Sequence, residues 1–200
     1  MQLDLQHHTQ VCLGLYEREL HSYLSSLGST AVAAIDAGAA DGAYSLYFLR
    51  SSKIKAVYAF EPDPAMRVLM LANVALNGFG GDGRLQLSES PVGAGGSSIS
   101  VALDDLSSTI AGPCVVKVDV EGGELQVLEG SRRLLERGGA SWIIETHSRE
   151  LESNCVELLQ SYGLKVTIVS PAWWRFAIRE ARPIAHNRWL VAHGSSLTSR

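Results

Sequence analysis

The chain has 200 residues, 46% of them hydrophobic and 19% charged, a composition that excludes an intrinsically disordered chain. Its length suits one domain with a sizeable buried core. The formal net charge of -4 gives no electrostatic reason to expect a nucleic acid as partner, because proteins that bind nucleic acids usually carry a basic surface.

The cysteines and the apolar runs indicate the compartment. Cys12, Cys114 and Cys155 are widely spaced and form no Cys-x-x-Cys pair, so neither a disulfide framework nor a structural zinc site is expected. No charged and then apolar leader opens the chain, and no apolar run approaches the ~20 residues that span a bilayer. We therefore expect a cytoplasmic protein without a membrane span.

The first half of the chain predicts alternating helices and strands. Residues 1–30 repeat apolar side chains at three- and four-residue steps and stop at Gly28, which predicts a covering helix ahead of one domain over residues 31–200. Residues 31–38 form a short apolar run that ends at a glycine, as a strand buried on both faces would. We then expect a helix over 43–50, a strand over 55–62, a helix over 64–76, a strand over 85–88 and a short helix at 103–106.

The second half continues the alternation. It predicts a strand over 114–120, a single helix over 123–137, a strand over 141–147, a helix over 155–162, and strands over 164–170 and 187–194. Seven strands that alternate with helices predict a Rossmann-like α/β domain, in which helices cover both faces of a mostly parallel sheet.

Ligands of such sheets bind beyond the carboxyl ends of the strands, so the strand-to-helix junctions are candidate sites. The first junction reads IDAGAADGAY, with Asp36, Gly38 and Gly42. An NAD site would normally have a glycine where Asp36 lies, because its pyrophosphate approaches the start of the helix. Asp36 would repel that anion and accept a cofactor with an ammonium group.

The next two junctions also carry acidic residues. Glu61 in AFEPDP follows a strand, and we expect it at the rim of the site, where a carboxylate accepts hydrogen bonds from the two hydroxyls of a ribose. Ribose recognition without a pyrophosphate site points to an adenosyl group. Ser88 and Glu89, after the following strand, are weaker candidates for binding the adenine amine.

The fourth and fifth junctions carry candidate catalytic residues. Lys117 and Asp119 lie in an otherwise apolar strand, where charges are costly unless they are paired or functional. Glu145 and His147 share one face at the end of the next strand, because side chains alternate along a strand. Glu124 and Arg132 are interpreted as solvated residues of a helix face.

In this order the motifs resemble the FkbM-type family of S-adenosylmethionine (SAM)-dependent methyltransferases. The matching blocks are IDAGAADGAY, AFEPDP, ALDDL, KVDVEGGELQVLEG and IIETH, between Asp36 and His147. The resemblance implies the class I methyltransferase fold, a three-layer α/β/α sandwich, with SAM as cofactor and contacts at Asp36, Gly38, Glu61 and Asp119. Our cofactor assignment adds their neighbours Ala39, Gly42, Tyr44, Pro62, Ser88 and Glu89.

The resemblance also implies methyl transfer to a hydroxyl group, here of a small molecule, sugar or lipid. His147 is predicted to be the base, with Glu145 orienting it and with Asp119 and Lys117 beside it, because imidazole titrates near neutrality. No metal is strictly required, although Asp119, Glu145 and His147 could instead ligate a divalent ion.

Other interpretations stay open. An NAD-type oxidoreductase or a catalytically silent SAM-binding module could use the same fold. The aromatic group Trp173, Trp174 and Phe176, with Arg175, could line an acceptor pocket, although such clusters are more often core. The acceptor, its pathway and the oligomeric state, for which a homodimer is one option, do not follow from the sequence.

Overall fold

The computed structural model describes residues 15–96, 100–176, 186 and 188–194. Residues 1–14 of the expected covering helix, with Cys12, lie outside the described residues, and so does Asn187, the first residue of the last expected strand. The first elements are η1 (Arg18–Leu20), α2 (His21–Gly28), β1 (Ala33–Ala37), α3 (Ala43–Leu49), β2 (Ala56–Phe60), α4 (Pro64–Leu76) and β3 (Leu85–Ser88).

The second half supplies the remaining strands. Its elements are η2 (Leu103–Leu106), β4 (Cys114–Val118), α5 (Glu124–Glu129), α6 (Arg132–Arg137), β5 (Ala140–Thr146), α7 (Arg149–Ser161), β6 (Lys165–Val169), η3 (Trp173–Phe176) and β7 (Arg188–His193). None of the helices in the described residues is long and apolar enough to cross a bilayer.

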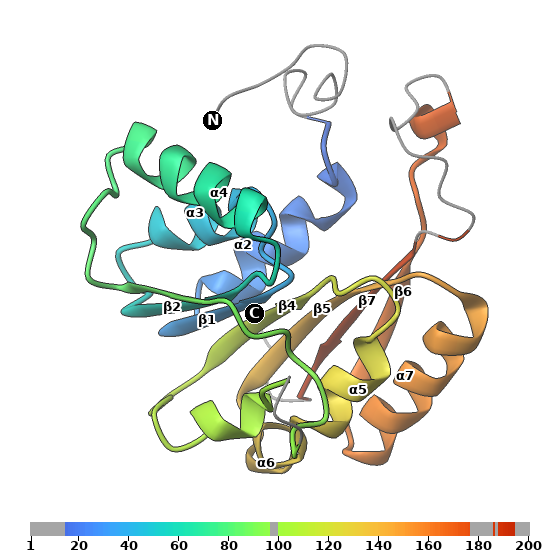
Figure 1. The fold of residues 1–200 in the computed structure, drawn as a ribbon. Helices are drawn as coiled ribbons and strands as arrows, with labels where there is room; N and C mark the ends of the chain where they lie inside the picture. The colour runs from blue at the N-terminus through green and yellow to red at the C-terminus, as the bar shows by residue number, and fades with distance from the viewer. Residues whose placement is uncertain (1–14, 97–99, 177–185, 187, 195–200) are drawn as a thin grey trace.

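The strands form one sheet in the order β3-β2-β1-β4-β5-β7-β6. All neighbours pair in parallel except β7, which runs antiparallel to both β5 and β6. Helices α2, α3 and α4 cover one face of the sheet, and α5, α6 and α7 cover the other (Figure 1). The predicted three-layer fold with a seven-stranded, mostly parallel sheet is confirmed.

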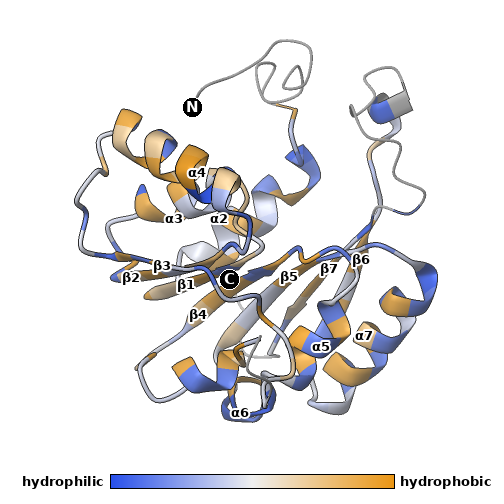
Figure 2. Ribbon diagram, viewed as in Figure 1, coloured by the Kyte–Doolittle hydropathy of each residue, from blue (hydrophilic) through white to orange (hydrophobic). Residues whose placement is uncertain are grey.

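Burial explains why the central strands read as continuous apolar runs. β1, β4 and β5 are buried along their whole length, because helices cover both faces of the sheet. One core lies between the sheet and α5, α6 and α7, and it includes Trp142 and Leu128. A second core lies between the sheet and α2 and α3, and it includes Phe48 and Trp189. The outer helix α7 alternates blue and orange in Figure 2, as a half-buried helix should.

The prediction of a single helix over residues 123–137 is wrong. The segment forms two helices, α5 and α6, because the chain breaks at Gly130 and Ser131. A Cβ at Gly130 would lie 2.0 Å from the carbonyl oxygen of Gly93. This close approach of two backbones requires glycine and fixes where α5 ends. The Asp104 carboxylate then accepts the amides of Arg133 and Leu134 at the start of α6.

Two further expectations need correction. Helix α7 begins at Arg149, six residues earlier than expected, because the Ser148 hydroxyl accepts the Leu151 amide and caps the helix. Trp173 is 87% exposed, so it is not the core residue that aromatic clusters usually supply. Arg175 lies over the ring of Trp189 and pairs with Glu19, which ties η3 to η1.

Candidate active site

The strand order places the candidate site between β1 and β4. Successive strands lie to one side of β1 as far as β3 and to the other side from β4, so β1 and β4 form the switch point where ligands of such sheets bind. The two strands end side by side, because Ala37 is in register with Val118 and the Asp119 amide donates to the Ala37 carbonyl at 2.9 Å. The first and fourth motifs therefore meet at one point.

The turn after β1 needs glycine at two positions. Gly38 has a φ of +80°, and a Cβ there would lie 1.8 Å from the backbone oxygen of Asp119. Gly42 has a φ of +86°, and a Cβ there would lie 2.6 Å from Cγ of Met70. Between them, buried Ala39 donates its amide to the Phe60 carbonyl. The predicted cofactor turn is thus held tightly against both β2 and β4.

Asp36 lies beneath this turn and is fully buried. Its Oδ2 accepts the Ser45 hydroxyl at 2.6 Å, whereas its Oδ1 has no hydrogen-bond partner among the described residues. Burial raises the pKa of Asp36 to about 6, although Lys117 and the Ser45 hydroxyl act in the opposite direction. The structure therefore places this predicted cofactor residue under the turn, inside the protein.

Glu61 lies at the end of β2 and is only 7% exposed, so the expectation of a rim position is wrong. Its Oε2 accepts the Ala40 amide at 2.7 Å and its Oε1 accepts the Asp63 amide at 2.8 Å. Each carboxylate oxygen can accept a second hydrogen bond, so a ribose could still bind. Glu61 therefore also ties the glycine turn to the chain after β2.

The remaining predicted adenosine contacts lie further out. The Ser88 carbonyl accepts the Glu61 amide at 3.0 Å, which puts the end of β3 next to the end of β2. The Glu89 side chain is 79% exposed and pairs with Arg67 at 3.3 Å. Arg67 also donates to the Pro62 carbonyl at 2.7 Å. These residues line the same edge of the sheet as Glu61.

Lys117 is the buried cation of the site. Its ammonium group lies 3.0 Å from Oδ2 of Asp119 and 4.8 Å from the centre of the Tyr44 ring. Burial alone would lower the pKa of Lys117, but four carboxyl groups outweigh burial and raise it; they belong to Asp119, Asp36, Glu17 and Glu145. The Lys117 amine is therefore charged and serves as the counter-ion of an acidic cluster, which does not suit it to be a base.

His147 pairs with Glu124, which the sequence interpretation had wrongly placed on a solvated helix face. Glu124 is fully buried, and its Oε1 accepts the Gly122 amide at 3.0 Å and lies 2.5 Å from Nδ1 of His147. Gly122, with a φ of +103°, turns the chain so that the first residue of α5 points into the protein. The only signal in the sequence was a glutamate directly after two glycines.

The partner that orients His147 is thus Glu124, in the place where Glu145 was predicted. The carboxylate at Nδ1 keeps the proton of the neutral ring on that nitrogen and leaves the lone pair on Nε2. Nε2 lies 3.6 Å from Oδ1 of Asp119 and has no hydrogen-bond partner among the described residues. The hydrogen bond to Glu124 raises the pKa of His147, against a smaller opposing effect of burial.

Asp119, Glu145 and His147 come together as predicted. One potential ligand atom from each lies within 4.8 Å of the others, which is close enough for a metal ion. Burial raises the pKa of Glu145, and the charge of Asp119 adds to the effect. The ammonium of Lys117 already pairs with Asp119, so one positive charge is present at this point without a metal.

Sequence reasoning missed a further carboxyl group of the cluster, that of Glu17. This residue precedes η1 and is 4% exposed, and its carboxylate accepts the hydroxyl of Tyr44. Burial raises its pKa to about 8, against the opposing charge of Lys117. No local pattern could have found Glu17, because its partners lie in distant parts of the chain.

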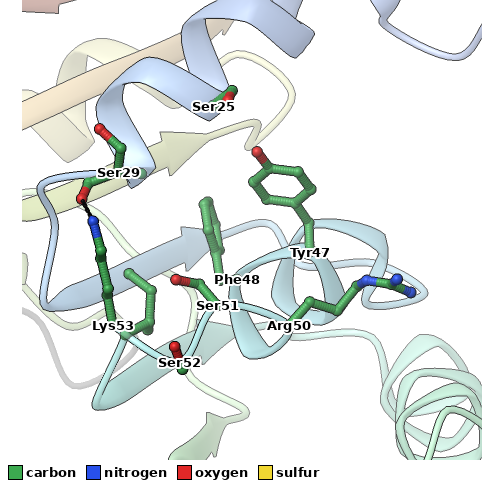
Figure 3. A pocket seen from close by; sticks show the side chains of 10 residues that line it. Ser25, Ser29, Tyr47, Phe48, Arg50, Ser51, Ser52 and Lys53 are labelled. Carbon is green, nitrogen blue, oxygen red and sulfur yellow. Dashed lines mark hydrogen bonds between the residues drawn. The ribbon is translucent and has the colours of Figure 1, made fainter.

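A separate cavity lies at the opposite, amino-terminal edge of the sheet. It has a volume of about 430 Å³ and lies between the ends of α2 and α3 and the loop that leads from α3 to β2. Figure 3 shows Tyr47 and several serines around it, with Lys53 donating to the Ser29 carbonyl. No predicted site residue lines this cavity, so the candidate site rests on the cluster at the carboxyl edge.

Residues 98–166, about a third of the chain, match the family described as the methyltransferase FkbM domain. The match includes β4, α5, β5 and α7 and therefore Lys117, Asp119, Glu124, Glu145 and His147. No curated protein sequence matches the chain.

Solved structures show the same fold. Methyltransferase FkbM from Methylobacillus flagellatus KT has a TM-score of 0.63 and 19% identity over 82% of this chain, which spans only 44% of that protein. Precorrin 8W decarboxylase from Methanobacterium thermoautotrophicum has a TM-score of 0.59 and 19% identity over 88% of this chain and 90% of its own. Fibrillarin from Aeropyrum pernix, which was crystallised with natively bound SAM, has a TM-score of 0.53 and 13% identity over 82% of this chain and 66% of its own.

Proposed function

We propose that the chain is a methyltransferase of the FkbM type, because residues 98–166 match the methyltransferase FkbM domain, and that it transfers the methyl group of SAM to a hydroxyl group of a small molecule, sugar or lipid. The observation that carries the proposal is the pair of Glu124 and His147 beside Asp119, next to the glycine turn at the switch point. This pair supplies an oriented base at the place where the fold binds ligands.

The proposed reaction needs few groups. The acceptor oxygen attacks the methyl carbon of SAM, the carbon–sulfur bond breaks, and its electron pair stays on sulfur as S-adenosylhomocysteine (SAH) forms. Nε2 of His147 takes the proton of the hydroxyl, and Glu124 stabilises the resulting imidazolium. Most of the rate would come from holding the oxygen in line with the methyl group.

The charge of the site favours this cofactor. Lys117 is surrounded by four carboxyl groups, those of Glu17, Asp36, Asp119 and Glu145. Even with Glu17 protonated near pH 7, because burial raises its pKa to about 8, the acidic groups outnumber the one ammonium group. A sulfonium ion is attracted to such a site and a pyrophosphate is repelled. Glu61 supports the same assignment, because its carboxylate lies where a ribose would bind in this fold.

Binding of SAM and SAH without binding of NAD is the first expected result. Isothermal titration of the protein with each of the three compounds measures it, and thermal stabilisation should accompany binding. NAD binding without heat from either adenosyl compound would favour the oxidoreductase. Binding of SAM, with no methyl transfer in a tritiated-methyl screen of sugars, lipids and other hydroxyl compounds, would favour the silent module.

Replacing Glu61 by alanine should weaken SAM binding by about 1.5–3 kcal/mol, the scale of hydrogen bonds to a charged group. Glu61 also holds the amides of Ala40 and Asp63, so we expect a lower melting temperature as well. Titration and thermal unfolding of Glu61→Ala measure the two effects. Exposed Glu136→Ala is the control for a lost negative charge, and an equal dissociation constant in wild type and Glu61→Ala would remove Glu61 from the site.

A divalent ion at Asp119, Glu145 and His147 is the alternative way to activate the acceptor. Methyl transfer measured in the presence of EDTA distinguishes activation by a divalent ion from proton removal by His147 alone. We expect the activity to persist, because His147 accepts the proton without a metal. Loss of activity in EDTA, with recovery on adding Mg²⁺ or Mn²⁺, would replace the base by a metal centre.

A further inference from the structure

Helix α4 presents an apolar face to solvent. All of its exposed residues are apolar, and Val68, Leu71 and Leu76 are 70%, 51% and 65% exposed. At about 3.6 residues per turn, these side chains lie on the side of the helix that faces away from the buried Met70 and Val74. Figure 2 shows α4 as mostly orange. The outer face of α4 is defined here by Ala65, Val68, Leu71, Ala72, Ala75 and Leu76.

The inner side of α4 already supplies the contacts that the fold needs. Met70 and Val74 pack in a core with Ala59 of β2, and the side-chain amide of Asn73 donates to the Asp41 carbonyl at 2.9 Å. The outer face takes no part in these contacts. Because a helix that is apolar all round is normally buried, this face is suited to contact another molecule.

We propose that the outer face of α4 binds the same face of a second copy of the chain, with the two helices antiparallel, so that the protein forms a homodimer. The inference does not depend on methyl transfer. A standard interface buries about 800 Å² on each partner, and α4 is only about 20 Å long. We therefore expect a weak dimer, with a Kd of about 1–100 µM.

The charges of α4 favour a second copy over a lipid surface. Helices that lie on membranes usually carry several lysines and arginines beside their apolar face. Arg67 is the one charged residue of α4 and pairs with Glu89 at 3.3 Å, and the formal net charge of the chain is -4, which an anionic membrane repels. In a symmetric dimer each residue of the face approaches its own kind, so a face without charges brings no like charges together.

The order of large and small residues makes the outer face complementary to itself. A two-fold axis at the middle of α4 places residues at equal distances before and after the middle opposite each other. Val68 then lies opposite Ala72 of the second copy, and Ala65 lies opposite Leu76. Leu71, close to the axis, lies against Leu71 of the second copy. Each of the first two contacts joins a large side chain to an alanine, which lets the helices approach closely.

Sedimentation equilibrium of the full chain, at concentrations up to about 200 µM, measures the dimer. Val68→Glu should raise its Kd at least about tenfold, because the contact would bury a carboxylate against an apolar surface. Glutamate favours helix and Val68 is 70% exposed, so we expect this variant to fold. Ser153→Glu is the matched control, since it adds the same charge at an exposed position of α7 and should leave the Kd within about twofold of wild type.

Disulfide formation tests the antiparallel arrangement and does not require Val68→Glu to fold. Cys114 and Cys155 are buried, so Leu71→Cys in a Cys12→Ser background supplies a single accessible thiol among the described residues. Mild oxidation should link two chains through this thiol. Ser153→Cys in the same background is the control and should stay monomeric on a non-reducing gel.

Three results would overturn the inference. The first is a wild-type chain that stays monomeric over the whole concentration range. The second is a dimer whose Kd does not change in Val68→Glu or that gives no disulfide in Leu71→Cys, because the contact would then lie elsewhere. The third is a monomer that sediments with vesicles of phosphatidylcholine and phosphatidylglycerol in wild type but not in Val68→Glu, because the outer face would then bind lipid.

Discussion

Replacing His147 by alanine should lower kcat about 10²–10⁴-fold and leave SAM affinity nearly unchanged, the usual range for loss of a general base. The hydrogen bond between Nδ1 of His147 and Glu124 orients the ring and leaves the lone pair on Nε2 to accept the proton. Initial rates with tritiated SAM, on the acceptor that wild type methylates fastest, measure the effect. Full activity of the variant would show that another group accepts the proton.

Glu124→Gln separates the role of the pair from that of His147 alone. Glu124 raises the pKa of His147, and only the neutral imidazole accepts a proton, so the rate should fall as the pH drops through this raised pKa. Without the negative charge of Glu124 the pKa of His147 falls, and the acidic limb of the rate profile should move to lower pH. The dependence of kcat on pH, measured in wild type and in Glu124→Gln, checks this shift. Identical acidic limbs would show that His147 is not the group whose protonation lowers the rate.

Gly38→Ala should destabilise the protein by about 3 kcal/mol and abolish detectable SAM binding. A Cβ at this position would lie 1.8 Å from the backbone oxygen of Asp119, and the φ of +80° is unfavourable for alanine. Both strand ends would have to separate to relieve the contact. Urea unfolding measures the stability and isothermal titration the binding.

Gly28→Ala is the matched control, because a Cβ there would meet no atom within 4 Å and the residue ends helix α2. We expect its stability to equal or exceed that of wild type by less than about 1 kcal/mol, since alanine favours helix more than glycine does. If Gly38→Ala unfolded at the same urea concentration as Gly28→Ala, the close approach of β1 and β4 would not be required for folding.

The location of the elements was largely predictable from local pattern. β1 and β4 are apolar because helices cover both faces of the sheet, and each is followed by a glycine-containing turn. The helix over Pro64–Leu76 was expected at the observed bounds, with Asn77 and Gly78 at its end. In the structure the Asp63 carboxylate caps its start. These signals act within a few residues of the position they determine.

Helix boundaries that depend on distant residues were not predictable in this way. The break between α5 and α6 is set by the carbonyl of Gly93, nearly forty residues away, which comes within 2.0 Å of where a Cβ at Gly130 would lie. The sequence around Gly130 does not distinguish it from a glycine inside a continuous helix. Only the packing of the loop before η2 against Gly130 shows that a side chain cannot fit at this position.

The sequence by itself determined the fold class, the edge of the sheet where the site lies, and the meeting of Asp119, Glu145 and His147. The physical reason is that parallel strands in a doubly wound sheet end at one edge, so motifs at their ends converge. The tertiary structure alone decided which carboxylate pairs with His147 and that Glu17 enters the site. Hydrogen bonds from Nδ1 to Glu124 and from Tyr44 to Glu17 join residues 23 and 27 positions apart, and side-chain direction at such separations is set by packing.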